Sequence, residues 1–251
     1  MATEVAVSPT PFPEHIPSIP STAPVLTTVY SFPAMEPLRF EHHSPFHLRL
    51  PLRRDLLHRA VIYEAAKTRT GTASTKWRSE IHGSKRKIRP QKGTGKARLG
   101  DKTSPMLRGG GVAFGPKPRD FSTELPRKIY DQAWRTALSY RYQKGELIIT
   151  EDDVDLPFPK TRLIKHIFEQ NHWGRPHGRS LIVTKSHRPN LHEALEEAGE
   201  DGRVLEEKEV DVKDLLELGR VIIERSALNK ILLDHQSDLV PMASRLTSTV
   251  S

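Results

Sequence analysis

Fifteen Lys and Arg residues gather between positions 67 and 119, where only two acidic residues, Glu80 and Asp101, accompany them. This stretch carries a local net charge of +13, whereas the rest of the chain has 24 basic and 29 acidic side chains. Cations at this density neutralise phosphates and release their counterions, and without a polyanion they would repel one another. The pattern predicts a nucleic-acid interface rather than an ordinary solvated surface.

The other residues of this basic segment (residues 67–119) suit a chain that threads through folded RNA. Nine of the 15 glycines fall here and let the backbone pass where a Cβ would clash. Ser and Thr hydroxyls reach phosphate and ribose oxygens, and Trp77 and Phe114 can stack on unpaired bases. Such a composition buries too little apolar surface to offset its ordering entropy, so we expect disorder in the absence of RNA. The predicted RNA-binding residues are Lys67, Arg69, Lys76, Trp77, Arg78, Lys85, Arg86, Lys87, Arg89, Lys92, Lys96, Arg98, Lys102, Arg108, Lys117 and Arg119.

Two glycine motifs inside the segment resemble nucleotide sites only superficially. A phosphate loop needs a glycine where Pro90 stands and a Ser or Thr where Ala97 stands. The glycines at 109–111 do not complete a dinucleotide fingerprint. We therefore predict no nucleotide site and no cofactor.

The histidines include two pairs, His172 with His177 and His187 with His192. Each pair is five residues apart, one beyond the helical spacing that presents two metal ligands together. We interpret them as surface residues and predict no metal site. Cysteine is absent, and neither a nucleophile elbow nor a pair of catalytic carboxylates is found. No catalytic residues are predicted.

Amphipathic helices are predicted on both sides of the basic segment. Apolar residues recur at helical spacing from Arg53, with Asp55 in the opening turn, to an end near residues 68–71. A second helix is predicted over residues 129–142, with Gly145 as its terminator.

Short apolar strands alternate with helices in most of the remaining chain. Strands are predicted over residues 25–32, 146–150, 180–184, 204–205 and 221–224, and helices over residues 160–170, 190–198, 214–218 and from a Ser226 cap to residue 233. This alternation predicts an α/β body with a mainly parallel sheet, covered on both faces in a Rossmann-like, three-layer manner. An RNA-modifying enzyme that docks RNA through the basic segment is the alternative. It would need a small-molecule site at the carboxyl ends of the strands, and nothing glycine-rich follows Ile149 or Val183.

The N-terminal part is rich in proline. Residues 1–24 hold six prolines and no Lys or Arg, which predicts an extended arm and not an Arg-rich transit peptide. Further prolines predict an irregular stretch up to residue 52. The predicted organisation is an extension over 1–52, a body over 53–66 and 120–234, an extended loop over 67–119 and a tail over 235–251. No apolar run approaches the ~20 residues that span a bilayer.

The order of residues within the basic segment resembles the signature loop of the family of large-subunit ribosomal protein four. Residues 89–98 read Arg-Pro-Gln-Lys-Gly-Thr-Gly-Lys-Ala-Arg, Ser-Pro follows at 104–105, and residues 108–116 read Arg-Gly-Gly-Gly-Val-Ala-Phe-Gly-Pro. The flanking helices resemble those that enter and leave that loop. A weaker similarity extends over residues 53–234.

This resemblance implies a structural protein that binds large-subunit rRNA, aids assembly and lines the peptide exit tunnel with the tip of its loop. Lys92 would face the tunnel near the site of macrolide antibiotics, and Arg69, Lys96, Arg98 and Arg108 would grip phosphates along the stem. The implied partners are rRNA, neighbouring ribosomal proteins including the other protein of the tunnel constriction, and the nascent polypeptide, without a membrane. The implied tip consists of Pro90, Gln91, Lys92, Gly93, Thr94 and Gly95, with the two glycines making the reversal.

The tip also departs from the bacterial pattern of the family. Bacterial members typically read Lys-Pro-Trp-Arg-Gln-Lys before the glycines, whereas residues 87–92 read Lys-Ile-Arg-Pro-Gln-Lys. The Pro-Gln-Lys order and the long N-terminal extension resemble mitochondrial members. The resemblance therefore implies a mitochondrial ribosome in the matrix, with bacterial cytoplasm or plastid as the alternatives.

Overall fold

The computed structural model describes residues 23–239, which form two compact units. We call residues 23–64 with 125–239 the body, and residues 65–124 the loop unit. The predicted arm over residues 1–24 lies almost wholly outside the described residues, as does most of the predicted tail.

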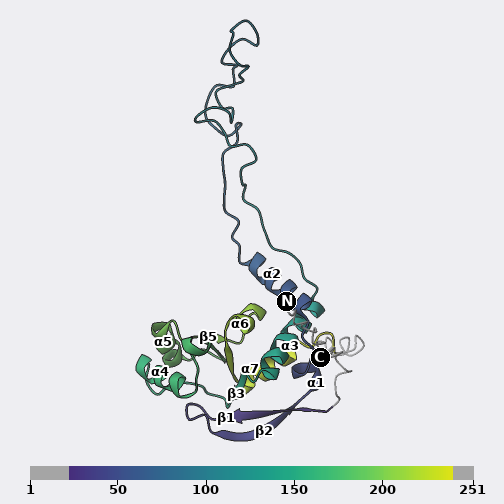
Figure 1. The fold of residues 1–251 in the computed structure, drawn as a ribbon, viewed down its shortest axis with the longest axis vertical. Coiled ribbons are helices and arrows are strands. Elements are labelled where there is room, and N and C mark those ends of the chain that lie inside the picture. Colours follow the sequence, from purple (N-terminus) through teal and green to yellow (C-terminus); the bar gives the residue numbers. More distant parts are fainter. Residues whose placement is uncertain (1–22, 240–251) are drawn as a thin grey trace, which may run out of the picture. The chain divides into compact units, whose positions relative to one another are not determined.

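A six-stranded sheet forms the centre of the body, in the order β2-β1-β3-β6-β4-β5 (Figure 1). Five strands run parallel, and β2 alone of the described strands runs antiparallel, along β1. The predicted α/β class with a mainly parallel sheet is confirmed. The strands are β1 (Val25–Tyr30), β2 (Pro37–His43), β3 (Leu147–Thr150), β4 (Ser180–Thr184), β5 (Gly202–Glu206) and β6 (Arg220–Glu224).

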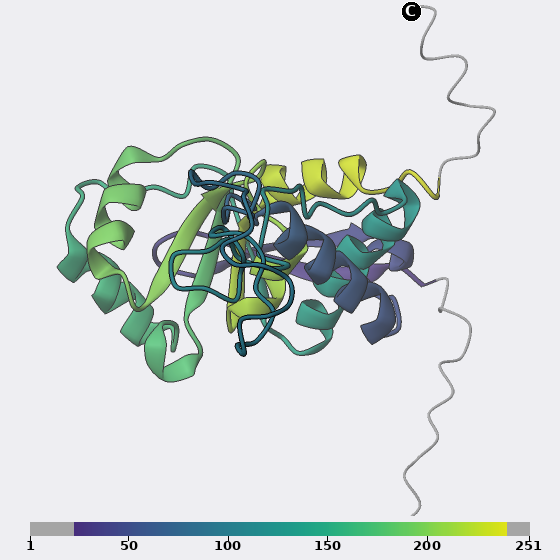
Figure 2. The ribbon, with the colours of Figure 1, turned by 90° about the horizontal axis from the view of Figure 1, so that it is seen from above.

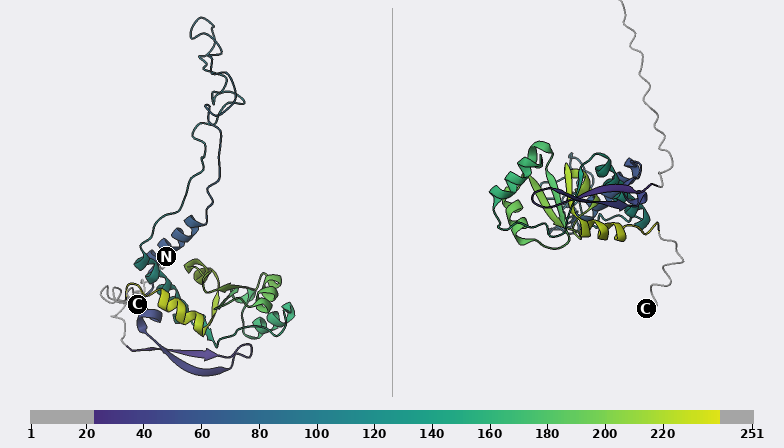
Figure 3. Two further views of the ribbon diagram at one scale, coloured as in Figure 1. Left: turned by 180° about the vertical axis from the view of Figure 1, so that it is seen from behind. Right: turned by 90° about the horizontal axis from the view of Figure 1, so that it is seen from below.

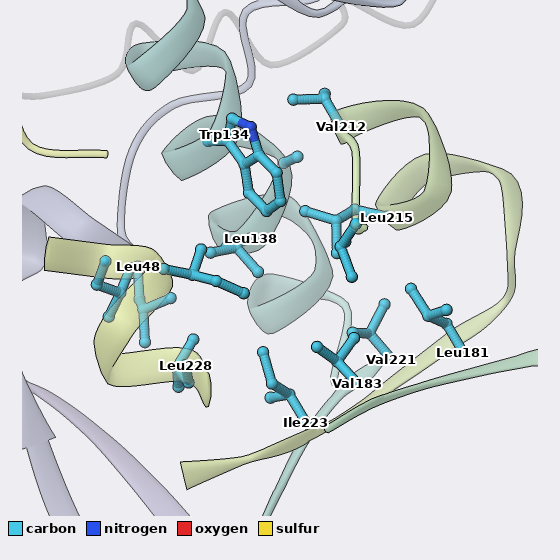
Figure 4. Close-up of a cluster of buried hydrophobic side chains, with 14 of the residues drawn as sticks. Leu48, Trp134, Leu138, Leu181, Val183, Val212, Leu215, Val221, Ile223 and Leu228 are labelled. Atoms are coloured by element: carbon cyan, nitrogen blue, oxygen red, sulfur yellow. The ribbon is translucent and has the colours of Figure 1, made fainter. Parts of the chain in front are cut away.

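Helices cover both faces of this sheet because its central strands are apolar on both sides. Leu181 and Val183 of β4 face one core cluster, whereas Ile182 between them faces the other. Side chains of α1, α2, α3, α6 and α7 complete the first cluster, part of which Figure 4 shows, and those of α4 and α5 complete the second. Figure 2 shows the ribbon of the body from above, with the green α4 and α5 on one side. The helices are α1 (Pro45–Leu48), α2 (Arg54–Lys67), α3 (Arg127–Gln143), α4 (Thr161–Gln170), α5 (Pro189–Ala198), α6 (Val212–Glu217) and α7 (Arg225–Asp234), with a short 3-10 turn at Arg175–His177.

The stretch that its prolines predicted to be irregular contains both β2 and α1, so this prediction was wrong. Pro37 is the first residue of β2, which lies at the edge of the sheet (Figure 3), and the start of an edge strand tolerates a residue without an N–H. Pro45 occupies the first turn of α1, and the Ser44 side chain accepts a hydrogen bond from the Phe46 N–H there. Val25, Val29 and Leu48 are buried in the first core cluster. The body therefore begins at β1 and not at residue 53.

Helix ends differ from their predictions by a few residues. Lys67 is the last residue of α2, so it belongs to a helix and not to the extended segment. Ser226 lies inside α7, whose N-cap residue is Glu224. Gly145 has a φ of 70° and its N–H donates to the Tyr142 carbonyl, so it ends α3 as predicted.

Glu64 of α2 holds the N-terminus of α6. One carboxylate oxygen accepts from the Val212 N–H at 3.0 Å and from the Tyr130 hydroxyl at 2.8 Å, and the other accepts from the Lys213 N–H at 2.9 Å. The residue is 4% exposed, and burial raises the pKa of its carboxyl group. Two of the N–H groups that a helix N-terminus leaves unpaired are thus satisfied by a side chain 148 residues away.

We expect Glu64→Ala to lower the free energy of unfolding of the chain by about 3 kcal/mol, because it leaves buried donors without an acceptor. Urea unfolding followed by circular dichroism measures this loss. Glu193→Ala, which removes an exposed carboxylate from α5, is the matched control and should change stability by less than about 0.5 kcal/mol. Equal effects of the two substitutions would contradict this role for Glu64.

Arg141 of α3 holds the other end of α6. Its Nε donates to the Leu215 carbonyl at 2.6 Å, and its terminal nitrogens donate to the carbonyls of Leu216 at 2.9 Å and Gly219 at 3.0 Å. The same guanidinium also contacts the Leu218 carbonyl and the Glu146 carboxylate. Helices α2 and α3, which flank the loop unit in the chain, therefore each anchor one end of α6.

The chain after α7 packs against α3. The His235 ring stacks on Trp134, with ring centroids 4.5 Å apart, and its Nδ1 lies 3.0 Å from a carboxylate oxygen of Asp131. Buried Arg135 donates to the Phe46 carbonyl and pairs with Asp238. These contacts satisfy two buried charges of α3 with residues beyond 234, the predicted end of the body.

Candidate nucleic-acid interface

No residue between the end of α2 at Lys67 and the start of α3 at Arg127 belongs to a named helix or strand. Figure 1 shows the chain there as two arms joined by an inner portion. We call residues 69–82 the first arm, residues 83–102 the inner segment and residues 103–121 the second arm. Composition predicted that this part is disordered without RNA, and the structure gives it a specific set of internal hydrogen bonds.

Backbone hydrogen bonds join the arms at several levels. The second arm donates to the first twice, from the Arg119 N–H to the Gly71 carbonyl at 3.2 Å and from the Val112 N–H to the Lys76 carbonyl at 3.0 Å. The first arm donates to the second once, from the Thr75 N–H to the Pro116 carbonyl at 3.0 Å. Further inward, backbone hydrogen bonds join the two ends of each of two shorter turns. Their hydrogen bonds run from the Ile88 N–H to the Gly100 carbonyl and from the Gly111 N–H to the Thr103 carbonyl, both at 3.0 Å.

Glycine is required where three stretches of the loop unit converge. A Cβ on Gly111 would lie 2.3 Å from the backbone nitrogen of Arg78, and one on Gly110 would lie 1.8 Å from the Ser104 carbonyl oxygen. Neither backbone neighbour can yield cheaply. Glycines 110 and 111 thus allow close packing within the loop unit itself. The glycine content of the basic segment had suggested only a close approach to RNA.

The segment that the family resemblance designates as the tip, residues 90–95, is exposed throughout. Gly93 and Gly95 have φ values of 88° and 63°, in the left-handed region that favours glycine, and open space surrounds both. The backbone reversal, not crowding, requires glycine here. Lys87 on the approach to the tip contacts the Gln91 side chain.

Besides Lys87, four of the predicted RNA-binding cations have partners inside the loop unit. Arg78 donates to Asp101 at 2.7 Å, and Lys117 donates to both carboxylate oxygens of Glu80 at 2.7 and 2.5 Å. Arg69 and Arg119 lie 4.1 and 4.2 Å from the centroid of the Phe121 ring. Lys117 also holds the pKa of the Glu80 carboxyl below its ordinary value, with the Trp77 N–H as the next contribution.

A second group of cations has exposed side chains that make no hydrogen bond or ion pair within the described chain. All of its members lie in the inner segment or just beyond it. They are Lys85, Arg86, Lys92, Lys96, Arg98, Lys102 and Arg108. Seven unpaired cations between positions 85 and 108 form a polycationic surface that suits the phosphates of an RNA.

The two aromatic residues predicted to stack on bases have different surroundings. Phe114 is fully exposed, with a φ of 53°, and no aromatic or cationic contact is found for it in the described structure. Trp77 is 45% exposed, and Lys117 Nζ lies 5.0 Å from its ring centroid. Phe121, which lies just beyond the basic segment, was not among the predicted residues; its place two residues after Arg119 was the available signal.

The position at which α/β enzymes bind ligands is filled by the chain itself. Glu224 ends β6 in the middle of the sheet and is 1% exposed. Its carboxylate accepts from the Val154 N–H at 2.9 Å and from the Lys185 N–H at 2.7 Å, and Arg188 lies 3.5 Å away. Loops after β3 and β4 are thereby closed over this edge.

The histidine pairs lie close in space. The rings of His172 and His177 are 5.3 Å apart between centroids, and those of His187 and His192 are 4.2 Å apart. Among residues 23–239, no three potential ligands are grouped so that they would hold a metal ion. Within the same residues, no helix is both long and apolar enough to cross a bilayer.

Comparison with known proteins gives one consistent family. A model of the ribosomal protein L4/L1 family matches residues 44–232. The large ribosomal subunit protein uL4m of Neurospora crassa is 54% identical over 236 residues, which cover 86% of this chain and 73% of that protein. The large ribosomal subunit protein uL4 of Trichormus variabilis is 39% identical over 178 residues, 70% of this chain and 82% of the relative. That of Dehalococcoides mccartyi is 50% identical over 113 residues, 45% of this chain and 53% of the relative.

Proposed function

The chain belongs to the ribosomal protein L4/L1 family, and we infer from this membership that it is a structural component of the large ribosomal subunit. It is not an enzyme, and the RNA-modifying alternative has no support. The 54% identity to a mitochondrial member over most of the chain favours the mitochondrial ribosome. Binding of large-subunit rRNA and a place at the peptide exit tunnel follow from the family.

The observation that carries the assignment of rRNA binding to particular residues is the unpaired cationic surface of the inner segment. Seven exposed Lys and Arg side chains between positions 85 and 108 have no protein partner in the described chain. Fixed positive charge without a counterion from the protein is what the phosphate backbone neutralises. We propose these cations as the main phosphate contacts, with Phe114 free to stack on an unpaired base.

We propose further that residues 90–95 line the exit tunnel, beside the nascent polypeptide and the other protein of the constriction. Their exposure and the glycine reversal support this placement. A location in the mitochondrial matrix and a Rossmann-like winding of the sheet are parts of the same proposal.

Cosedimentation with purified mitochondrial large subunits tests the assignment. The chain should stay with the subunits through washes at rising salt concentration. It should be released only under conditions that disassemble the subunit. Release at the salt concentration that removes loosely adsorbed basic proteins would count against a structural place in the subunit.

The tip makes a separate prediction. We expect Lys92→Glu to alter the response of mitochondrial translation to a macrolide, because a reversed charge would face the tunnel instead of a phosphate. Subunit assembly, measured by sucrose-gradient profiles, should be nearly normal. Lys96→Glu is the matched control, since it makes the same charge change at a cation expected to grip phosphate, and it should impair assembly more. An assembly block by Lys92→Glu with a normal macrolide response would instead make Lys92 a phosphate anchor.

A further inference from the structure

Two carboxylates lie inside the most cationic part of the chain, and both are paired with cations far away in sequence. Asp101 of the inner segment pairs with Arg78 of the first arm, 23 residues away. Glu80 of the first arm pairs with Lys117 of the second arm, 37 residues away. Each ion pair therefore connects two stretches of the loop unit.

The other carboxylates of the loop unit make no such connection. Asp120 accepts from the N–H and the hydroxyl of Ser122, at 2.8 and 2.7 Å, within its own turn. Glu124 is exposed, and no hydrogen bond or ion pair involving it is found among the described residues. Long-range pairing thus distinguishes Asp101 and Glu80 from acidic residues of the same unit.

Asp101 lies where the parts of the loop unit converge. Its side chain is 5% exposed although Arg78, its partner, is 63% exposed. Its backbone forms a bridge with Lys87 and accepts from the Ser104 N–H at 3.3 Å. Gly111 of the second arm packs against the backbone of Arg78 at the same junction. A buried carboxylate with one cationic partner fixes geometry in a way that an exposed surface pair does not.

We propose that Asp101 and Glu80 are positioning residues, which hold the loop unit in the shape that rRNA accepts. Arg78 and Lys117 then serve the loop unit rather than the RNA, and the unpaired cations of the inner segment supply the phosphate contacts. This inference rests on the proposed function, because it concerns the same interface. It gives Arg78 and Lys117 a different role from the RNA contacts that were predicted from their charge alone.

The proposal differs in sign from simple electrostatics. Removal of a negative charge from a cationic RNA-binding segment should strengthen binding if charge alone matters. Removal of a positioning carboxylate should weaken it, because the RNA must then order the segment at its own cost. Asp101→Asn distinguishes these two expectations, since Asn is similar in size but carries no charge and has an NH2 donor in place of one acceptor oxygen.

The test is the affinity of the full chain for a transcript of mitochondrial large-subunit rRNA, measured at several salt concentrations. Asp101→Asn should bind about tenfold more weakly than the natural chain with an unchanged salt slope, since preorganisation is lost and phosphate contacts are not. Asp120→Asn, the matched control, makes the same charge change at a carboxylate confined to its own turn and should bind as tightly as the natural chain or more tightly. If Asp101→Asn binds as tightly as Asp120→Asn, the proposal is wrong.

A charge swap gives a second, independent measurement. Arg78→Asp alone should weaken binding strongly, and Arg78→Asp combined with Asp101→Arg should restore most of the affinity by remaking the pair. Were Arg78 a phosphate ligand, the swapped chain would stay as weak as the single variant, and the proposal would fail. The proposed function itself would be refuted if the natural chain did not bind the transcript, or if its affinity did not fall steeply with salt concentration.

Discussion

Deletion of residues 79–108 is expected to weaken binding of the chain to large-subunit rRNA by about a thousandfold or more, because phosphate contacts dominate such affinities. The deletion removes nine Lys and Arg residues, among them all seven that are exposed and unpaired. The salt dependence of the affinity should become much shallower at the same time. Filter binding or fluorescence anisotropy over a series of salt concentrations measures both quantities.

The control for this deletion keeps the length of the chain and removes only its charge. A variant in which the nine Lys and Arg residues of this stretch become Gln should lose nearly as much affinity as the deletion. The body should stay folded in both variants, since its core clusters contain no residue of this stretch. An unchanged affinity and salt slope in the deletion variant would refute the assignment of RNA binding to the basic segment.

The largest expected effect on stability comes from Arg141. Arg141→Ala should lower the free energy of unfolding by about 3–5 kcal/mol, the cost of breaking a buried, hydrogen-bonded charge network. The substitution leaves carbonyls at the end of α6 and just beyond it without a donor, and it leaves Glu146 with only its longer ion pair to Lys144, at 3.8 Å. Urea unfolding followed by tryptophan fluorescence, with Trp134 and Trp173 both buried in the body, measures the loss.

Arg141→Lys keeps the result interpretable if the alanine variant does not fold. An ammonium group carries the charge but cannot reach several carbonyls in the fork geometry of a guanidinium. It should therefore cost less than the alanine substitution and still destabilise measurably. Arg59→Ala, at an exposed arginine of α2, is the control and should change stability by less than about 0.5 kcal/mol. If Arg141→Ala lowered the free energy of unfolding by as little as the control does, this would show that water replaces the guanidinium as the donor to these carbonyls.

The parts of the fold that were predictable from sequence are those that local pattern determines. Strand β4 was predicted at its observed bounds, because a run of apolar residues bounded by polar ones has few alternatives. Helix α3 was predicted from its apolar spacing and its terminal glycine. Strand β2 was not, because proline signals a break unless the strand lies at an edge, and edge position is a property of the whole sheet.

The candidate site divides in the same way. Charge counting located the basic segment, because fifteen cations within one stretch need no tertiary information. It did not separate Arg78 from Lys92, since the partner of Arg78 lies 23 residues further along the chain. Nor did it reveal that Glu64 and Arg141 anchor α6, because those contacts span 148 and 74 residues. Pairings of this kind depend on the tertiary structure and produce no local pattern in the sequence.

The internal hydrogen bonds of the loop unit also bear on chain entropy. To join α2 to α3 in one step, the chain must close a loop of more than fifty residues, and each doubling of loop length costs about 0.6 kcal/mol more. The turns between residues 88 and 100 and between residues 103 and 111 close only 12 and 8 residues. Once they have formed, the closures at Lys76 with Val112 and at Gly71 with Arg119 each join ends that are already near. A stretch without helix or strand thus has a zipper-like folding route, which starts at its inner turns and ends at the stacked arginines around Phe121.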